Sequence, residues 1–552
     1  MDEFKEDILK FLKKETKLEN VDLEFPPNPE MGDYAFPCFA LAKELKKSPS
    51  EIAKELSDKF KPTRLVNEAK PQGPYLNFFV NKNKIANDTI KDILKQKQKF
   101  GSTGIGNKKK ILLEHTSINP NASPHVGRAR NALIGDSLVR ILRFQGYKVE
   151  VHYFVNDVGK QIAMLVLGAE GKASIDFGDL LHIYIEINKK LEENPDLEKQ
   201  VLELLNKLEK NDKETRKKFE NVVKICIDGQ KKILSDLGIK YDVFDYESKY
   251  LWSKETDKSL KLLEKTGKLF IDGFNRWVLD QKGYGLGMKI PVFVMTRADG
   301  TSLYPLRDIA YNLEKAKKGE NIVVLGEDQK LYQEQIAAAL KELKIKQPRV
   351  VHYSFVLLQE GKMSTRKGNL VLLEEFMDEA VKKATEEIKK RHEKADEKSA
   401  KVIAYGAVKY GILKVSPEKN VVFDWEQALS FEGETSPYIQ YAYARISSIL
   451  AKGKLLPNAD LDLLKEKEEA ELVKSLSQFP EIVLKATHEL RPHLIANYAY
   501  TLAQKFNEYY HKHQVLKAEE DVKYARMLLI SAIRQVLKNG LSLLGIEVLE
   551  NM

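Results

Sequence analysis

The alternation of apolar and polar positions predicts a separate α/β module at the start of the chain. Apolar residues recur at helical spacing around residues 8–12, and a second helix is predicted over residues 40–60. Residues 73–80 are rich in aromatic and β-branched side chains and predict a strand. The glycines of residues 101–107 indicate a linker. We therefore place the first domain at residues 1–105.

A strand–helix–strand unit follows this linker. Residues 111–114 form a short apolar run, and apolar residues recur at helical spacing over residues 126–142. Gly146 ends that helix, and residues 149–155 predict the next strand. This order is that of the first unit of a doubly wound parallel sheet of the Rossmann type. We place the first half of such a domain at residues 106–170.

The rest of the chain is predicted to be mostly helical. The charged helical pattern of residues 171–275 indicates a helical insertion, after which sheet-like segments return and predict the second half of the Rossmann-type domain at residues 276–370. Helical spacing then continues to the end, which predicts a helical connector at residues 371–425 and a helical bundle at residues 426–552. The predicted fold class is therefore α/β, with a doubly wound parallel sheet between an N-terminal α/β module and a C-terminal all-α bundle.

Composition and charge narrow the class of protein. The chain has 552 residues, of which 43% are hydrophobic and 31% charged, as in a globular protein of roughly three to five domains. No apolar run approaches the roughly 20 residues needed to cross a bilayer, and the N-terminus lacks the apolar core of a signal peptide. The two cysteines, Cys38 and Cys226, support neither a disulfide framework nor a cysteine zinc site. We expect a cytoplasmic monomer without a structural metal. The net charge of +9 permits RNA as a partner without requiring it.

The first segment with recognisable chemistry lies where the first Rossmann strand ends. Between Glu114 and Asn131 the chain leaves the strand and enters a helix that begins near His125. The free N–H groups and positive dipole end of such a helix favour phosphate. Gly127 lets a ligand approach the backbone, while His125 and Arg128 can donate to phosphate oxygens. Taken alone, such a segment is more often an ordinary βα turn with a surface histidine.

A second segment, residues 361–369, follows a predicted strand. It is bounded by glycines and carries three cations, Lys362, Arg366 and Lys367. A mobile basic loop of this kind can close over a triphosphate and stabilise the charge of the leaving pyrophosphate. The alternative is a solvated basic turn.

Together the two segments resemble the signatures of class I aminoacyl-tRNA synthetases. The segment His125–Arg128 is similar to their HIGH motif, and Lys362–Arg366 is similar to their KMSKS loop. The resemblance implies that three residues are catalytic: His125, Lys362 and Arg366. It implies that six residues bind ATP: His125, Gly127, Arg128, Lys362, Met363 and Ser364.

Further matches identify the arginyl-tRNA synthetases within this class. Residues 171–235 of the insertion are weakly matched. The further matches lie in the N-terminal module, in the second Rossmann half and in the C-terminal helices: Gly32–Ala35, Asn77–Phe79, Asp299–Tyr304, Asp308–Tyr311, Gly326–Gln329, Phe423–Trp425, Phe431–Gly433, Pro437–Ala442, Ala525–Arg526 and Leu544–Ile546. The N-terminal matches resemble the family's extra tRNA-binding domain. Those at the end resemble its anticodon-binding domain.

The resemblance implies an arginine pocket built from five residues: Glu114, Asn119, Tyr304, Asp308 and Gln329. A guanidinium is a planar fork of donors, which carboxylates bind and an aromatic ring can hold flat. Glu114 and Asp308 can supply the carboxylates. Tyr304 precedes Asp308 by one helical turn, and Pro305 suits a helix start. By resemblance, Asn119 and Gln329 hold the amino or carboxylate end of the substrate.

The implied reaction has two steps and no covalent protein intermediate. Arginine attacks the α-phosphate of ATP, which gives arginyl-adenylate and pyrophosphate, and the terminal ribose of tRNA(Arg) then takes the arginyl group. Mg²⁺ would accompany ATP without a dedicated protein cage. The family usually needs bound tRNA before it activates arginine. Four residues of the helical domain form a candidate RNA-binding region, with packing inside the bundle as the alternative: Tyr438, Tyr441, Tyr443 and Arg445.

Four positions depart from the family pattern. Arg128 replaces the last histidine of HIGH, and Thr365 replaces the second lysine of KMSKS. Tyr332 replaces a histidine, and Ser436 stands where glycine is common. One alternative is a tRNA-binding relative that has lost catalysis. A second is a class I synthetase for another amino acid, although cysteinyl enzymes require zinc-binding cysteines and a leucine-type pocket would not contain two carboxylates. A third, a small-molecule adenylyltransferase, does not explain the terminal domains.

Overall fold

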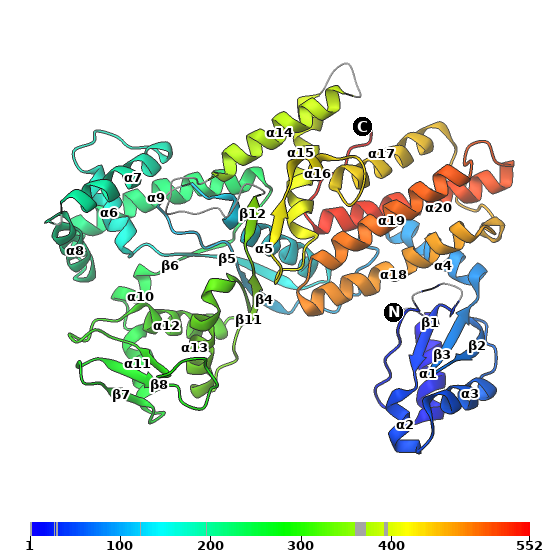
Figure 1. Cartoon of the computed structure of the whole chain (residues 1–552), viewed down its shortest axis with the longest axis horizontal. Helices are drawn as coiled ribbons and strands as arrows, with labels where there is room; N and C mark the ends of the chain where they lie inside the picture. The colour runs from blue at the N-terminus through cyan, green and yellow to red at the C-terminus, as the bar shows by residue number, and fades with distance from the viewer. Residues whose placement is uncertain are drawn as a thin grey trace.

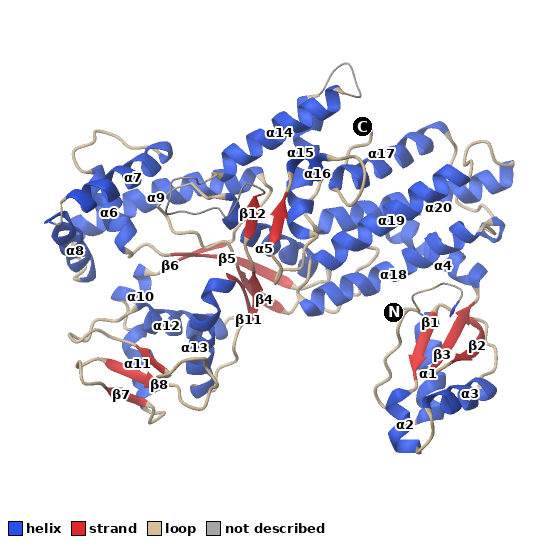
Figure 2. Cartoon of the chain, viewed as in Figure 1, coloured by secondary structure: helices blue, strands red, loops and turns tan. Residues whose placement is uncertain are grey.

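The computed structural model describes residues 3–26, 28, 31–121, 123–194, 196–358, 371–390 and 396–552. A five-stranded parallel sheet lies near the centre of the molecule, with an insertion and a small antiparallel sheet on one side and the helical domain and the N-terminal module on the other (Figures 1 and 2). No helix among the described residues is both long and apolar enough to cross a membrane.

The N-terminal module is a three-stranded antiparallel sheet of order β1–β3–β2 with helices packed against it. Its elements are α1 (Glu3–Thr16), β1 (Tyr34–Pro37), α2 (Phe39–Leu45), α3 (Pro49–Lys59), β2 (Val66–Gln72) and β3 (Tyr75–Val80). The single helix predicted over residues 40–60 is therefore two helices. Lys46 ends α2 in the left-handed conformation, with φ 53°. Ser48 then begins α3 with a capping box, followed by Pro49.

The helix after this module, α4 (Lys82–Gln96), leads back toward the rest of the chain and packs against helices of the C-terminal domain. A short 3₁₀ turn, η2 (Lys97–Lys99), follows it. Asn539 of the C-terminal domain donates to the carbonyl groups of Lys97 and Phe100, both at 3.0 Å. The chain just before the predicted linker is thus held against the helical domain.

The central sheet has the order β11–β10–β4–β5–β6, and all its neighbouring strands are parallel. Its strands are β4 (Lys110–Glu114), β5 (Lys148–Val155), β6 (Val243–Tyr246), β10 (Glu320–Gly326) and β11 (Arg349–Tyr353). The long helix α5 (Val126–Phe144), buried along most of its length, joins β4 to β5. These three elements confirm the predicted strand–helix–strand unit and the doubly wound α/β class.

Strands occur in two segments that the sequence predicts to be helical. Residues 171–275 do contain helices of an insertion, but they also contain β6, which pairs with β5, and β7. Residues 371–425 contain β13 (Val421–Phe423), which pairs in parallel with β12 (Val356–Leu358). Each of these strands has only three or four residues, and charged helical sequence surrounds them. The pattern of apolar and polar positions therefore does not distinguish them from the neighbouring helices.

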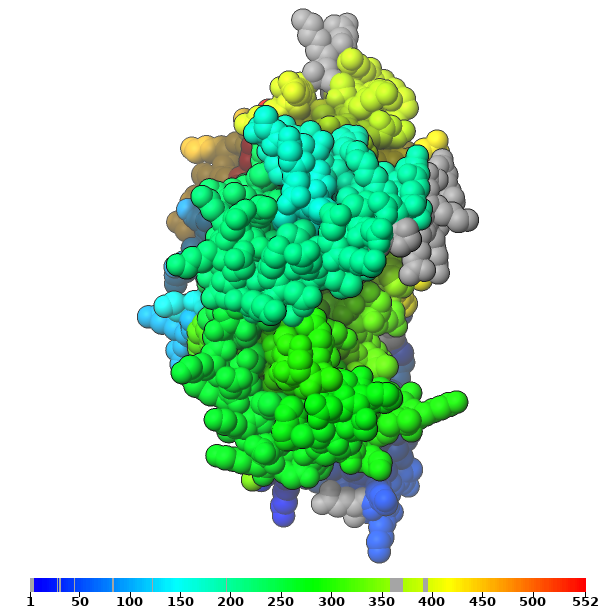
Figure 3. All heavy atoms as spheres, turned by 90° about the vertical axis from the view of Figure 1, so that its left-hand side faces the viewer, coloured from blue at the N-terminus to red at the C-terminus, as the bar shows by residue number. Residues whose placement is uncertain are grey.

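The insertion and a small antiparallel sheet form one end of the molecule, with the insertion above the small sheet in Figure 3. The helices of this region are α6 (Lys160–Ala169), α7 (Phe177–Glu193), α8 (Asp196–Glu209), α9 (Lys213–Asp236), α10 (Ser248–Trp252) and α11 (Glu255–Glu264). The sheet contains β7 (Leu269–Ile271), β8 (Trp277–Asp280) and β9 (Val292–Val294). The predicted second half of the Rossmann-type domain therefore begins with strands that belong to this small sheet.

Two helices pack against the small sheet, one leading from it to β10 and the other joining β10 to β11. They are α12 (Tyr304–Ala316) and α13 (Lys330–Glu342), with the 3₁₀ turn η3 (Glu327–Gln329) before the second. Together with the small sheet they enclose a separate apolar core, which includes Phe293, Ile309 and Ile336. This core fixes the relative position of α12 and α13.

Apart from β13, the described part of the C-terminal third is helical, as predicted. It contains α14 (Leu373–Lys389), α15 (Glu397–Leu413), α16 (Trp425–Leu429), α17 (Ser436–Lys452), η5 (Leu461–Leu463), α18 (Lys467–Glu489), α19 (His493–Lys512) and α20 (Glu520–Leu543). The end of α20 contacts the Rossmann-type domain directly, because Ser137 of α5 donates to the carbonyl of Leu543 at 2.9 Å.

Candidate functional site

The loop that leaves β4 at the carboxyl edge of the central sheet has an unusual backbone. Thr116 and Ser117 adopt positive φ angles of 75° and 42°, which are costly for residues other than glycine. Asn131 of α5 holds this loop, because its side chain accepts from the Thr116 N–H at 2.6 Å and donates to the Val324 carbonyl at 2.9 Å. The chain after Glu114 is therefore held in one conformation next to β10.

His125 lies at the N-cap of α5, as the sequence predicts, with extended backbone angles of −94° and 160°. Its imidazole makes no capping hydrogen bond, and its Nδ1 is buried without a partner among the described residues. Burial and the neighbouring Arg128 lower the pKa of His125 to about 4. The ring is therefore neutral at physiological pH and can still donate from one nitrogen. Gly127 and Arg128 lie in the first turn and are half-buried.

The KMSKS-like residues Lys362, Met363, Ser364, Thr365 and Arg366 lie outside the described residues. The chain on both sides of them adjoins α5. On one side, β12 packs against α5. On the other, the Val126 N–H donates to Val371, and the Leu373 N–H donates to Pro124 at 2.8 Å. The residues that flank the KMSKS-like segment thus contact α5, the helix that begins at the HIGH-like segment.

Asp308 and Tyr304 lie one turn apart at the start of α12, as predicted. Tyr332 of α13 donates a hydrogen bond from its hydroxyl to Asp308 Oδ2, and its ring lies 5.3 Å from that of Tyr304. Tyr304 is 54% exposed, so its ring is accessible to a ligand. A carboxylate and an aromatic ring therefore stand together on two helices.

Glu114 is buried at the end of β4 and lies near Asp308. Its Oε2 accepts from the amine of Lys315 at 2.6 Å and lies 2.9 Å from the hydroxyl of Tyr311. Lys315, on the last turn of α12, is only 1% exposed. Burial raises the pKa of Asp308 to about 7, and the charge of Glu114 contributes to that rise, so the two predicted carboxylates interact.

Two further carboxylates, which the sequence did not indicate, lie beside these. Asp245 of β6 is 2.6 Å from Nδ1 of His152, and the buried Glu247 accepts from Nε of Arg307 at 2.7 Å. The charge of Glu247 also raises the pKa of Asp308. Among the described residues, Lys315 and Arg307 are the lysine and arginine side chains bonded to these four carboxylates, so the group keeps a negative excess. Such a site attracts a cationic ligand.

Asn119 and Gln329 are exposed at the same edge of the sheet. Asn119 follows β4 and donates to Gln161 at 3.0 Å, whereas Gln329 ends η3 and lies 3.3 Å from Asp328. Neither contact involves Glu114 or Asp308. The structure therefore brings Tyr304, Asp308 and Glu114 together and leaves these two amides at the rim.

A separate cavity of about 1020 Å³ lies in the helical domain. Three of the four candidate RNA-binding residues line it: Tyr438, Tyr441 and Arg445. The guanidinium of Arg445 lies 4.7 Å from the ring centre of Tyr441 and 4.9 Å from that of Tyr510. The fourth, Tyr443, is 1% exposed, and its hydroxyl donates to Glu550 at 2.8 Å. For Tyr443 the alternative interpretation, packing inside the bundle, therefore describes the structure.

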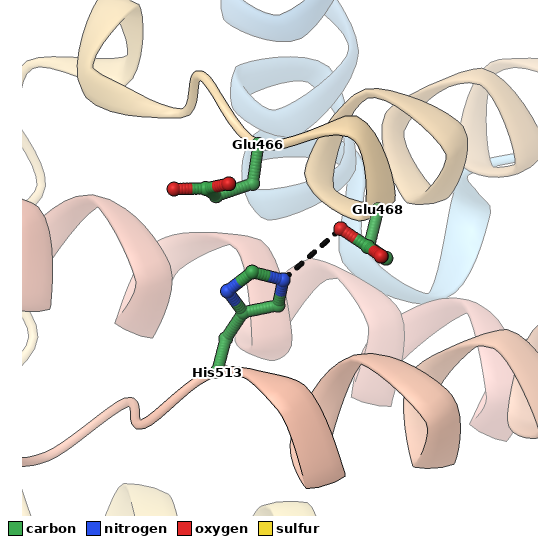
Figure 4. A group of neighbouring side chains, drawn as sticks. All are labelled: Glu466, Glu468 and His513. Atoms are coloured by element: carbon green, nitrogen blue, oxygen red, sulfur yellow. Dashed lines mark hydrogen bonds and ion pairs between the residues drawn. The ribbon is translucent and has the colours of Figure 1, made fainter.

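One group of side chains among the described residues is close enough to hold a cation: Glu466, Glu468 and His513 (Figure 4). It lies in the helical domain, far along the chain from the sheet. Glu468 already accepts from His513 at 3.0 Å and from Lys512 at 2.8 Å. These ion pairs lower the pKa of Glu468 to about 2. The cluster is therefore a network of ion pairs.

Comparison with known proteins agrees with this architecture. Residues 89–425 match the family described as tRNA synthetases class I (R), catalytic domain. Residues 439–552 match the DALR anticodon binding domain, and residues 2–80 match the arginyl tRNA synthetase N terminal domain.

Individual relatives match over nearly the whole chain. The arginine–tRNA ligase of Methanocaldococcus jannaschii is 43% identical, over 96% of this chain and 95% of that protein. The arginine–tRNA ligase of Methanocella arvoryzae is 41% identical, over 93% and 92% respectively. The solved structure of Thermus thermophilus arginyl-tRNA synthetase superposes with a TM-score of 0.87 at 29% identity, over 99% of both chains. The resemblance drawn from the motifs is confirmed, and the chain belongs to the arginyl-tRNA synthetase family of class I aminoacyl-tRNA synthetases.

Proposed function

We propose that this protein ligates L-arginine to tRNA(Arg) in two steps, with arginyl-adenylate as the intermediate. The observation that carries the proposal is the juxtaposition of Asp308, Glu114 and the open ring of Tyr304 in a site with excess negative charge. A guanidinium satisfies such a site, because its planar donors suit carboxylates and its face suits an aromatic ring. Asn119 and Gln329, at the rim, are assigned to the amino and carboxylate end of the amino acid.

ATP is assigned to the start of α5. In the proposed complex, neutral His125 donates to a phosphate oxygen, Gly127 gives the phosphates access to the backbone, and Arg128 supplies positive charge. Lys362, Met363, Ser364 and Arg366 complete the ATP site from the KMSKS-like segment. No protein nucleophile is required, so the residues act by positioning the substrates and by neutralising phosphate charge.

Mg²⁺ is proposed to enter with ATP. The carboxylates nearest the pocket are bonded to cations or hydroxyl groups: Glu114 to Lys315, Glu247 to Arg307 and Asp308 to Tyr332. They fit a ligand that brings its own positive charge better than a protein cage for a metal. The ion would then be held mainly by phosphate oxygens and water, as is usual for magnesium nucleotides.

The cavity of the helical domain is proposed to bind an unpaired base of tRNA(Arg). Base–aromatic stacking and cation–π contacts provide affinity for single-stranded RNA, and Tyr441, Tyr438 and Arg445 supply these groups.

We further propose that one chain is sufficient for activity and that it acts in the cytoplasm. A solution mass near 63.1 kDa by light scattering would support the monomer, and twice that value would contradict it.

Arginine-dependent exchange between ATP and labelled pyrophosphate tests the proposed function. We expect exchange with arginine when cognate tRNA is present, and little exchange without tRNA. Citrulline, a neutral analogue of arginine, should give no exchange because it lacks the guanidinium charge. Absence of exchange with both arginine and tRNA would contradict the proposal and favour a relative that binds tRNA without catalysis.

Substitution of Arg445 tests the RNA-binding cavity. We expect Arg445→Ala to raise the Michaelis constant for tRNA about tenfold, because stacking on one base is worth roughly 1–3 kcal/mol. The Michaelis constant for arginine should stay the same. Tyr443→Phe is the matched control on the same helix, since its ring is buried and its hydroxyl points to Glu550. Equal effects of the two variants on tRNA would contradict the assignment.

A further inference from the structure

Tyr332, one of the departures from the family pattern, contacts both the carboxylate and the ring of the proposed guanidinium site. It is the third residue of α13, a helix that packs beside α12 (Figure 1). Its hydroxyl donates to Asp308 Oδ2. Its ring packs against Tyr304 with the centroids 5.3 Å apart, and edge-on against Phe293 at 5.7 Å. One side chain therefore joins two residues that would touch the substrate.

The apolar core beside the small sheet holds Tyr332 in position. Phe293 of β9 belongs to the apolar core that also holds α12 through Ile309 and α13 through Ile336. The hydroxyl therefore meets Asp308 by virtue of packing that does not depend on the substrate. Burial and the charge of Asp308 raise the pKa of the Tyr332 hydroxyl well above its usual value, so the group remains a donor at any physiological pH.

Asp308 needs such a donor because its surroundings disfavour its charge. Burial is the largest effect, and Glu247 and Glu114 add like charge. On the other side, the hydroxyl of Tyr332 and the guanidinium of Arg307 favour the ionised carboxylate. The hydrogen bond occupies Oδ2 and leaves Oδ1 for a ligand. A guanidinium binds best when this carboxylate is ionised and held at a fixed angle to the ring it stacks on.

We infer that Tyr332 is a positioning residue for arginine: its hydroxyl orients the Asp308 carboxylate and its ring supports Tyr304. The inference rests on the proposed function, since it assumes that these two residues bind the guanidinium. Tyr332 does not itself touch the reacting atoms. Its effect should therefore appear in arginine binding, and neither in ATP binding nor in the rate at saturating arginine.

The test compares Tyr332→Phe with wild type in tRNA-dependent pyrophosphate exchange. The substitution removes only the hydroxyl and keeps the ring. We expect the Michaelis constant for arginine to rise about tenfold at pH 7, because hydrogen bonds to charged groups are the stronger kind. The Michaelis constant for ATP and the turnover number should stay within about twofold of wild type.

The pH dependence separates positioning from general damage. Because the hydroxyl lowers the pKa of Asp308, its removal raises that pKa, and a larger fraction of the carboxyl is neutral at pH 7. The midpoint of the pH profile of kcat/KM for arginine should therefore move to higher pH in Tyr332→Phe. At pH 9 the variant should recover most of its arginine affinity. Histidine is the residue that the family pattern has at this position. Tyr332→His should therefore retain much of the wild-type affinity for arginine, because its ring can donate a hydrogen bond.

Tyr284→Phe is the matched control. Its hydroxyl bonds Glu342 in the same part of the molecule, away from Asp308. An unchanged arginine Michaelis constant and pH profile in Tyr332→Phe would overturn the inference alone, provided that wild type shows arginine-dependent exchange. Equal changes for ATP and arginine would also overturn it, because they indicate general damage to the site. No exchange by wild type would overturn the proposed function itself.

Discussion

Replacement of Asp308 by asparagine is expected to raise the Michaelis constant for arginine about 100-fold. Asparagine has the same shape and can still accept from the Tyr332 hydroxyl, so the variant removes the charge and little else. Loss of one partner of a desolvated charge pair costs about 3 kcal/mol, which corresponds to roughly 100-fold in affinity. The Michaelis constant for ATP should change less than about twofold, because ATP is assigned to the start of α5. Pyrophosphate exchange at varied arginine concentration measures both constants.

The pH dependence of kcat/KM for arginine tests the role of Asp308 independently. Burial raises the pKa of Asp308 to about 7, so the carboxyl is protonated below that pH and ionised above it. In wild type, kcat/KM for arginine should fall about tenfold for each pH unit below 7 and level off above it. In Asp308→Asn this dependence should disappear. Glu314→Gln on the same helix is the control, since Glu314 pairs with Lys249 and Lys318. An unchanged arginine constant in Asp308→Asn would show that the pocket lies elsewhere.

The parts of the fold that the sequence predicts well are those with long, regular patterns. The apolar run before Glu114 and the helical spacing of residues 126–142 correspond to β4 and α5 within a few residues. Residues 243–246 could not be recognised in the same way. They read Val-Phe-Asp-Tyr, with a carboxylate in the middle, and only pairing with β5 makes them a strand. Tertiary context decides such short segments.

The sequence does not indicate the carboxylates of Asp245 and Glu247 because it does not predict strand β6. Asp245 lies in β6, and Glu247 comes directly after it, at the carboxyl edge where functional groups of parallel sheets gather. A correct assignment of β6 would have drawn attention to both. The bond between Glu114 and Lys315 is a different case. These residues are 201 positions apart, and both are buried, so no local pattern connects them.

In the helical domain, helical spacing distinguishes the residues that line the cavity from the one that packs inside the bundle. Tyr438, Tyr441 and Arg445 are separated by three and four positions, which places them on one face of a helix. Tyr443 falls off that face by the same periodicity. The structure places the first three in one cavity and buries Tyr443. Helical spacing alone therefore separates the candidate contacts from the packing residue.

Replacement of His125 by alanine is expected to lower the turnover number of pyrophosphate exchange about 100-fold or more. In the proposed complex the imidazole donates to a phosphate whose negative charge grows in the transition state, and loss of one such donor typically costs roughly 10²–10³ in rate. The Michaelis constant for arginine should change little, because the arginine pocket is built from other elements. The pKa of about 4 means that His125 is neutral from pH 6 to 9, so its contribution should not vary with pH in that range.

The fold should survive this change, which makes the kinetic result interpretable. His125 lies at the N-cap of α5, but its side chain makes no capping bond there. The backbone bonds from Val126 to Val371 and from Leu373 to Pro124 hold the segment without the imidazole. The melting temperature of His125→Ala should therefore stay close to that of wild type. His125→Asn keeps a shorter donor and should have an intermediate rate. A turnover number within threefold of wild type in the alanine variant would contradict a role in phosphate binding and would shift that role to Arg128 and the KMSKS-like segment.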